Sequence, residues 1–154
     1  MYRTLMTRKP VEIETSDVRK RLRAAIDASR RAAAVRRIQI DGAAAAYKVL
    51  LEQTAAPVVH VLANVLLAEG YNFTVSTPTG GLRLASAKSP EDSIEFALDT
   101  SQAEPFVVLR VSQTRGRRVL QHERAVKGRT AIEHLTEEDV LQALLEELAP
   151  FVER

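Results

Sequence analysis

Four arginines recur at helical spacing near the start of the sequence. At about 100° per residue, Arg19, Arg23, Arg30 and Arg37 fall within one narrow stripe. Such a stripe could follow a nucleic-acid backbone, where each phosphate contact releases counterions. The competing interpretation is a solvated helix face, or one docked on the acidic C-terminal helix. We favour the competing interpretation, because no helix-turn-helix or zinc-finger pattern is present and only 5% of residues are aromatic.

A second basic cluster lies on the last predicted hairpin. Its members are Arg115, Arg117, Arg118, Arg124, Lys127 and Arg129, opposed only by Glu123. A basic β-ribbon can enter a nucleic-acid groove or hold an anionic ligand. Basic side chains on an edge hairpin equally prevent sheet-to-sheet aggregation while they stay solvated, and we favour that role.

No arrangement of residues in the sequence indicates a catalytic or metal site. His60, His122 and His134 lack metal-ligand spacing, and the sequence predicts that His60 packs in the core and that His122 is partly buried opposite Leu109. Asp92, Glu95 and Asp99 are acids expected on a wet sheet face. The serines lack a nucleophile-elbow pattern, and Thr79-Gly80-Gly81 lacks the lysine of a phosphate loop. We therefore predict no catalytic residue, no metal and no cofactor, and we favour a non-enzymatic protein over an enzyme whose site forms from residues distant in the sequence.

The absence of cysteine excludes disulfides, thiolate nucleophiles and cysteine-based metal sites. The longest strongly apolar stretch, residues 57–68, is too short to cross a membrane, and residues 1–30 contain no apolar segment typical of a secretion signal. Arginine outnumbers lysine by 17 to 5 and alanine is abundant, a bias typical of GC-rich bacterial genomes. We expect a bacterial, cytoplasmic protein that does not bind membranes.

The charge of the chain is divided between its two parts. The net charge of the 154 residues is +2, but residues 1–38 carry eleven basic and four acidic residues, giving +7, and residues 39–154 carry eleven basic and sixteen acidic residues, giving −5. An asymmetry of this kind bears on partners rather than on fold.

Hydrophobic periodicity predicts helices at both ends of the chain. After an irregular arm, Ser16 or Asp17 caps a helix from about Val18 to Arg37, and the β-branched and turn-forming residues 38–42 end it. A second helix covers residues 42–53, and Pro57 opens a third helix or kinks a longer one. The predicted core stripe of that third helix is Val58, Val61, Leu62, Val65 and Leu66, with Gly70 ending the helix. A C-terminal helix, 137–149, follows a cap at Thr136 and ends before Pro150.

Between Gly70 and the C-terminal helix the apolar period changes from about 3.6 to 2. Five strands with short connections lie between residues 71 and 126, which predicts an antiparallel meander. The side chains expected beneath the covering helices are Tyr71, Phe73, Val75, Leu82, Leu84, Ile94, Phe96 and Leu98. The fourth strand differs from the others because Phe106-Val107-Val108-Leu109 is apolar on both faces, as in a strand that is covered twice or lies at an interface.

The predicted fold class is α+β: an antiparallel meander of about five strands, flanked by N-terminal helices and one C-terminal helix packed on the sheet. We expect a basic arm and helix over residues 1–40 and an α+β domain over residues 41–154, with its first helices at 43–69.

Two functions follow from these patterns, and a third, an enzyme that acts on a small anionic molecule through the hairpin arginines, would need a concave pocket. The first is a protein-interaction or adaptor module that forms a homodimer, with Phe106 and Val108 or Leu22 and Ile26 at its interface. The second is a nucleic-acid-associated protein that binds phosphates through Arg19, Arg23, Arg30 and Arg37, assisted by Arg117 and Arg118.

Overall fold

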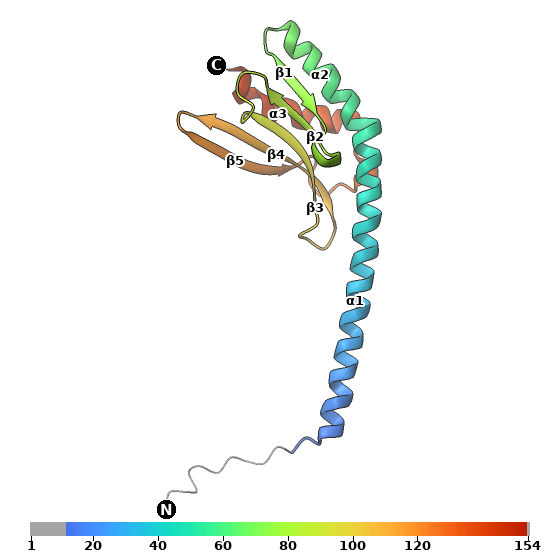
Figure 1. Cartoon of the computed structure of the whole chain (residues 1–154). Coiled ribbons are helices and arrows are strands. Elements are labelled where there is room, and N and C mark those ends of the chain that lie inside the picture. Colours follow the sequence, from blue (N-terminus) through green and yellow to red (C-terminus); the bar gives the residue numbers. More distant parts are fainter. Residues whose placement is uncertain (1–11, 154) are drawn as a thin grey trace, which may run out of the picture. The chain divides into compact units, whose positions relative to one another are not determined.

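The computed structural model describes residues 12–153 and has the α+β architecture predicted from the sequence (Figure 1). A long helical run is followed by a five-stranded sheet and a C-terminal helix. The helices are α1 (Thr15–Leu50), α2 (Ala56–Ala68) and α3 (Glu137–Val152). The strands are β1 (Phe73–Ser76), β2 (Leu82–Ser86), β3 (Ser93–Asp99), β4 (Phe106–Arg115) and β5 (Arg118–Ala125). The chain forms two compact units, divided between Ile38 and Gln39.

Helix α1 continues through residues 38–42, so the predicted break there is wrong. Isoleucine costs a helix only a few tenths of a kcal/mol and an internal glycine about 1 kcal/mol. Alanine, the best helix former, lies on both sides of Gly42, at residues 32–34 and 43–46. In the second unit, the last turns of α1 also pack Ala43, Ala46 and Tyr47 against the core. These gains outweigh the local preference for a turn at Asp41-Gly42.

A π-helical turn, η2 (Leu51–Ala55), joins α1 to α2 without a break. The predicted separate helices are therefore one helical run. Pro57 lies in the first turn of α2 and, because it has no N–H, it cannot donate a hydrogen bond to the preceding turn of the continuous helical run. The wider π turn directly precedes this proline and buries Leu51 and Ala55.

The five strands pair in sequence order, and every pairing is antiparallel, as predicted. The predicted register of the last hairpin is wrong by two residues. Its turn is Gly116-Arg117, so His122 pairs with Val111 and Leu109 pairs with Arg124. Because a strand repeats every two residues, this offset leaves each side chain on its predicted face.

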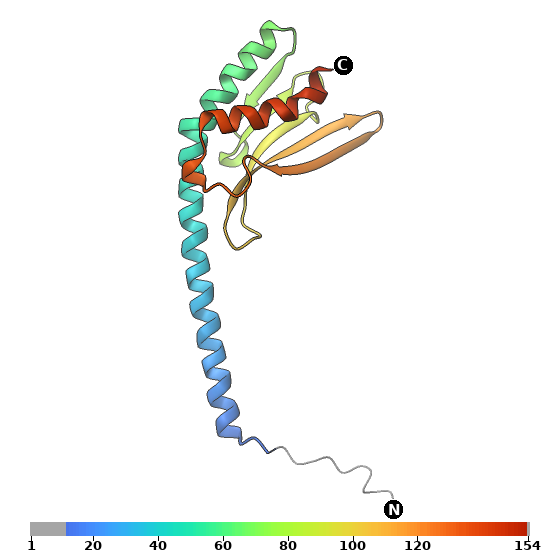
Figure 2. The ribbon, with the colours of Figure 1, turned by 180° about the vertical axis from the view of Figure 1, so that it is seen from behind.

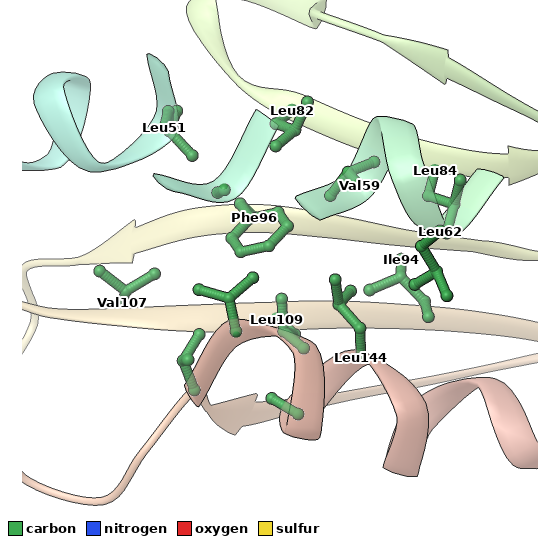
Figure 3. Packing of buried hydrophobic residues seen from close by; sticks show 14 of the residues in the cluster. Leu51, Val59, Leu62, Leu82, Leu84, Ile94, Phe96, Val107, Leu109 and Leu144 are labelled. Carbon is green, nitrogen blue, oxygen red and sulfur yellow. The ribbon is translucent and has the colours of Figure 1, made fainter. Parts of the chain in front are cut away.

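Helices α2 and α3 cover one face of the sheet and enclose the core with it (Figure 2). All eight side chains predicted beneath the helices lie in this core or pack against it. Val59 and Leu62 of α2 and Leu144 of α3 meet Phe96 and Leu109 of the sheet (Figure 3). The core therefore depends on segments from both ends of the second unit.

Helix α3 begins at the predicted cap but passes Pro150 and ends at Val152. The final turn is anchored to the start of the sheet. The rings of Phe151 and Phe73 meet edge-on with centroids 6.3 Å apart, and the Tyr71 hydroxyl donates a hydrogen bond to the Val152 carbonyl over 2.9 Å. These contacts offset the cost of a proline near the helix end.

Candidate interaction surfaces

The first unit contains an exposed apolar stripe on α1. Val18, Leu22 and Ile26 follow one another at i, i+4 and i+8, and Leu22 and Ile26 are 57% and 40% exposed. We call Val18, Leu22 and Ile26 the α1 stripe. The smaller Ala25 and Ser29 lie on the same arc of the helix. Leu22 and Ile26, predicted as interface residues, are therefore accessible to a partner.

Basic side chains flank the α1 stripe. Arg19, Arg23, Arg30 and Arg37 are all exposed. The ion pair between Arg21 and Asp17, 3.1 Å long, is a local i, i+4 contact of the kind that adds only a few tenths of a kcal/mol to a helix. This part of α1 is thus a basic amphipathic helix.

A second apolar surface lies between α2 and α3. It is a groove of about 530 Å³, and we call it the α2–α3 groove. Its lining residues are Pro57, Val58, Val61, Leu62, Val65, Glu137, Glu138, Leu141 and Leu145. Val61 and Val65 are 63% and 53% exposed, and Leu145 is also exposed. The groove is therefore aliphatic along its length, with two carboxylates at the start of α3.

The α2–α3 groove exposes part of the stripe predicted to face the core. The buried side chains of α2 are Val59, Leu62, Ala63 and Leu66, so the prediction that Val61 and Val65 face the core is wrong. Residues 58–66 contain two overlapping apolar series, and periodicity alone cannot choose between them. The excess of apolar residues on α2 was the available sequence signal for a second surface.

The outer face of the sheet is polar and carries alternating charges. The register places Arg83, Glu95, Arg110 and Glu123 side by side across β2, β3, β4 and β5. Arg110 Nε donates to Glu123 Oε1 over 2.8 Å, and Arg83 donates to the Pro90 carbonyl over 2.6 Å. A hollow of about 670 Å³ lies over this row. Because opposite charges alternate along the row, it presents no concentrated charge to a ligand.

The remaining predicted interface residues lie on β4. Phe106 is half-buried, whereas Val108 is only 2% exposed. Val108 pairs with the small Ala97 and Ala125 on its neighbouring strands. The chain itself therefore covers Val108, which presents no surface to a partner.

Tyr47 on α1 lies within the influence of this charge row. Burial, followed by the negative charge of Glu95, raises the pKa of Tyr47 to about 12, and the positive charge of Arg110 opposes this rise. Its phenol is therefore neutral over the physiological range.

The acidic helix α3 pairs with two of the six members of the hairpin's basic cluster. Arg124 contacts Glu146, and Lys127 lies 3.1 Å from Asp139. Hydrogen bonds from Gln142 and then Arg124 lower the pKa of Glu146. Arg115, Arg117, Arg118 and Arg129 are exposed. Part of this cluster thus holds α3 to the sheet and is not available for an anionic ligand.

Both buried histidine predictions are wrong. His60 is exposed, because the buried face of α2 is the one through Val59. His122 is exposed on the edge strand, where its ring contacts the carboxylate of Glu147. His134 is exposed as well. Within residues 12–153, no group of three histidine or acidic side chains is placed to hold a metal ion.

The acids considered for catalysis have structural partners. Asp92 is buried, and its carboxylate accepts a hydrogen bond of 2.6 Å from the Thr114 amide. The hydroxyl and then the amide of Ser101 donate to Asp99 and lower its pKa. These contacts tie loops to strands and leave Asp92 and Asp99 without the geometry of an acid–base pair.

The helical run of residues 15–68 contains one 18-residue window, with a mean hydropathy of 1.4, that is long and apolar enough to cross a membrane. One third of that window is buried within the protein. Val59, Leu62 and Leu66 belong to the core of the second unit, and core helices of water-soluble proteins satisfy the same criterion. The stretch is therefore weak evidence for a membrane span.

No protein-family model, no curated protein and no solved structure matches this chain.

Proposed function

We propose that this protein is a non-enzymatic interaction module that forms a homodimer through the α2–α3 groove. The observation that carries the proposal is the exposure of Val61, Val65 and Leu145 along one continuous groove of a folded unit. Contiguous apolar surface of this kind is typical of protein-binding sites. Burial of each aliphatic side chain against a partner would contribute up to about 1.5 kcal/mol.

A symmetric dimer is the simplest assembly for such a surface, because closed two-fold dimers are the commonest oligomers. The chain also exposes a second apolar surface, the α1 stripe, that a copy of itself could supply or receive. The arginine and alanine bias and the absence of cysteine favour a bacterial cytoplasm as the compartment.

Sedimentation velocity over a wide concentration range tests the homodimer. We expect the wild-type protein to change from monomer to dimer as its concentration rises, and the groove variant Val61→Gln/Val65→Gln to remain monomeric. Leu67→Gln is the matched control, because Leu67 is 58% exposed on the same helix but does not line the groove. A wild-type monomer at every concentration, or a groove variant that dimerises normally, contradicts the proposal.

Nucleic-acid binding is the second candidate function. It is favoured by the exposed stripe of Arg19, Arg23, Arg30 and Arg37 on a segment whose net charge is strongly positive. Fluorescence anisotropy with a labelled DNA duplex at about 50 mM salt tests it, because electrostatic affinity is greatest at low salt.

In that experiment the informative variant changes Arg19, Arg23, Arg30 and Arg37 to alanine, and we call it the four-arginine variant. The control is Arg115→Ala/Arg129→Ala, which removes two exposed charges from the second basic cluster, outside the predicted phosphate-binding residues. DNA binding that is lost in the four-arginine variant and retained in the control would establish this function. Absence of binding by the wild-type protein excludes it.

A further inference from the structure

The α1 stripe and the α2–α3 groove are complementary to each other. Each is a row of exposed aliphatic side chains, and basic residues predominate around the α1 stripe whereas the charged residues that line the groove are both acidic. We propose that the groove is occupied by residues 18–26 of α1 from a second copy of this chain. This pairing rests on the homodimer proposed above and identifies the two surfaces that form it.

The spacing of the two surfaces supports the pairing. At a rise of 1.5 Å per residue, Val18 and Ile26 lie about 12 Å apart along their helix. Pro57 and Val65, at the two ends of the groove on α2, lie about 12 Å apart by the same measure. Anchors at i and i+4 that enter an apolar groove are a recurrent mode of helix recognition. One row of three aliphatic side chains therefore matches the length of the groove.

Charge determines which helix fits the groove. Three acids of α3 already have basic partners on or next to β5. Asp139 pairs with Lys127. Glu146 contacts Arg124, and Glu147 contacts His122. The carboxylates that line the groove, Glu137 and Glu138, have no ion pair within residues 12–153.

A partner helix with basic side chains beside its apolar row would complete this charge pattern. Arg19 and Arg23 lie directly beside the α1 stripe. Opposite charges at the rim of an interface favour encounter and set the register of the partner.

The same charges disfavour the two homotypic arrangements. Residues 15–38 contain eight basic and two acidic residues, so two α1 stripes packed together would bring like charges into contact. Two grooves packed together would place Glu137 and Glu138 of both copies at one interface. Only the pairing of the stripe of one copy with the groove of the other places opposite charges together.

In a two-fold dimer this pairing occurs twice, since each copy supplies one helix and one groove. A variant that lacks either surface should therefore lose both contacts. A mixture of one variant that lacks the stripe and one that lacks the groove retains one contact. That contact joins the intact stripe of the second variant to the intact groove of the first.

The test uses two full-length variants that leave every charge unchanged. The stripe variant is Leu22→Gln/Ile26→Gln, and the groove variant is the one introduced above. Val35→Gln is the matched control on α1, because Val35 is 55% exposed but lies away from the stripe. All samples are treated with nuclease, and their mass is measured by sedimentation velocity, with a fluorescent label on the groove variant.

We expect each variant to be monomeric alone and the labelled groove variant to sediment as a dimer when the stripe variant is added. The Val35→Gln protein should dimerise like the wild type. This mixed dimer should form at higher concentration than the wild-type dimer, because one of its two contacts is missing.

Each alternative predicts a different result. Loss of dimerisation by the stripe variant alone indicates stripe-to-stripe pairing, and loss by the groove variant alone indicates groove-to-groove pairing. Failure of the stripe variant and the groove variant to associate when mixed excludes the stripe-to-groove contact. Any of these results overturns the inference. A homodimer still forms in each case, but loss by the stripe variant alone also overturns the groove as its contact surface. A wild-type protein that is monomeric after nuclease treatment overturns the homodimer as well, and a mass that falls on that treatment favours nucleic-acid binding.

A charge exchange provides a second test. Arg19→Glu/Arg23→Glu should weaken dimerisation by at least tenfold, and Glu137→Arg/Glu138→Arg should do the same. Mixing the two exchanged proteins should restore association, because the reversed charges again face each other. Association that the exchanges leave unchanged overturns the proposed register.

Discussion

Gly42 and Gly70 differ in the backbone conformation that each adopts. A Cβ added to Gly42 would meet nothing within 4 Å, and the residue has ordinary helical geometry. Gly70 also has open space around it, but its φ is +94°, a conformation that side chains with a Cβ rarely adopt. Two glycines with equal space therefore differ in backbone conformation alone.

We predict that Gly42→Ala raises the free energy of unfolding by about 0.5–1 kcal/mol, because alanine loses less backbone entropy in a helix. Gly70→Ala should lower it by about 1 kcal/mol, since it forces a residue with a Cβ into the left-handed region. Urea denaturation of both variants measures the two changes. A destabilising Gly42→Ala would show that the helix is interrupted at that residue in solution.

Asp139 is the residue whose ionisation is most directly linked to helix α3. Its pKa is lowered mainly by the hydrogen bond that the Thr136 amide donates to its carboxylate, 3.0 Å long, and next by Lys127. The Asp139 amide in turn donates to the Thr136 hydroxyl over 3.2 Å. A carboxyl whose pKa is lower in the folded state stabilises the fold when it is ionised.

The contribution of Asp139 should therefore be complete near neutral pH and disappear as the pH falls below about 4. We predict that Asp139→Asn is less stable than the wild type at neutral pH and that the difference shrinks in acid. Thermal unfolding across this pH range measures it. A difference that does not vary with pH would mean that the charge of Asp139 has no part in the cap.

At the scale of elements, α2 presents valines to two different environments. Val59 is completely buried among the core residues, whereas Val61, two residues later, is 63% exposed in the groove. The orientation of α2 on the sheet, and not the composition of the helix, produces this difference.

Val59→Ala should lower the free energy of unfolding by about 2 kcal/mol, because it removes two buried carbons and leaves a cavity. Val61→Ala should change it by less than about 0.5 kcal/mol in the monomer. Guanidinium denaturation at a concentration below dimerisation compares the two. Equal losses would show that Val61 also packs inside the monomer.

At the scale of the whole molecule, the division of charge between residues 1–38 (+7) and residues 39–154 (−5) should govern association. The proposed contact pairs the basic helix of one copy with the acidic rim of another. Exposed charges of this kind are screened over about 10 Å at 0.1 M salt.

We predict that the dissociation constant of the homodimer rises several-fold between about 50 and 500 mM salt. The Glu137→Gln/Glu138→Gln variant should bind more weakly at low salt and show a smaller salt dependence, because the paired charges are gone. Sedimentation at several salt concentrations measures both. Dimerisation that strengthens with salt would indicate a contact without these charges.

The fold class and much of the core could be predicted from sequence because the relevant signals are local and repetitive. The period of two in residues 73–98 places Phe73, Leu84 and Phe96 on one face, and short turns require neighbouring strands to be antiparallel. The exposure of the residues predicted at an interface followed from the sequence only in part, since Leu22 and Ile26 are exposed but Val108 is covered. Exposure depends on which other segments lie over a residue, and periodicity contains no record of that.

The sequence by itself determined the five antiparallel strands, the start of the C-terminal helix and the unequal distribution of charge, since these depend on the residue types within short segments. Only the tertiary structure decided that α1 continues through Gly42, that α2 turns Val59 inward and Val61 outward, and that α3 leaves Glu137 and Glu138 beside an apolar groove. The physical reason is that α2 has apolar residues on two faces, and either face could pack against the core. The choice is made by packing energy summed over distant segments of the chain.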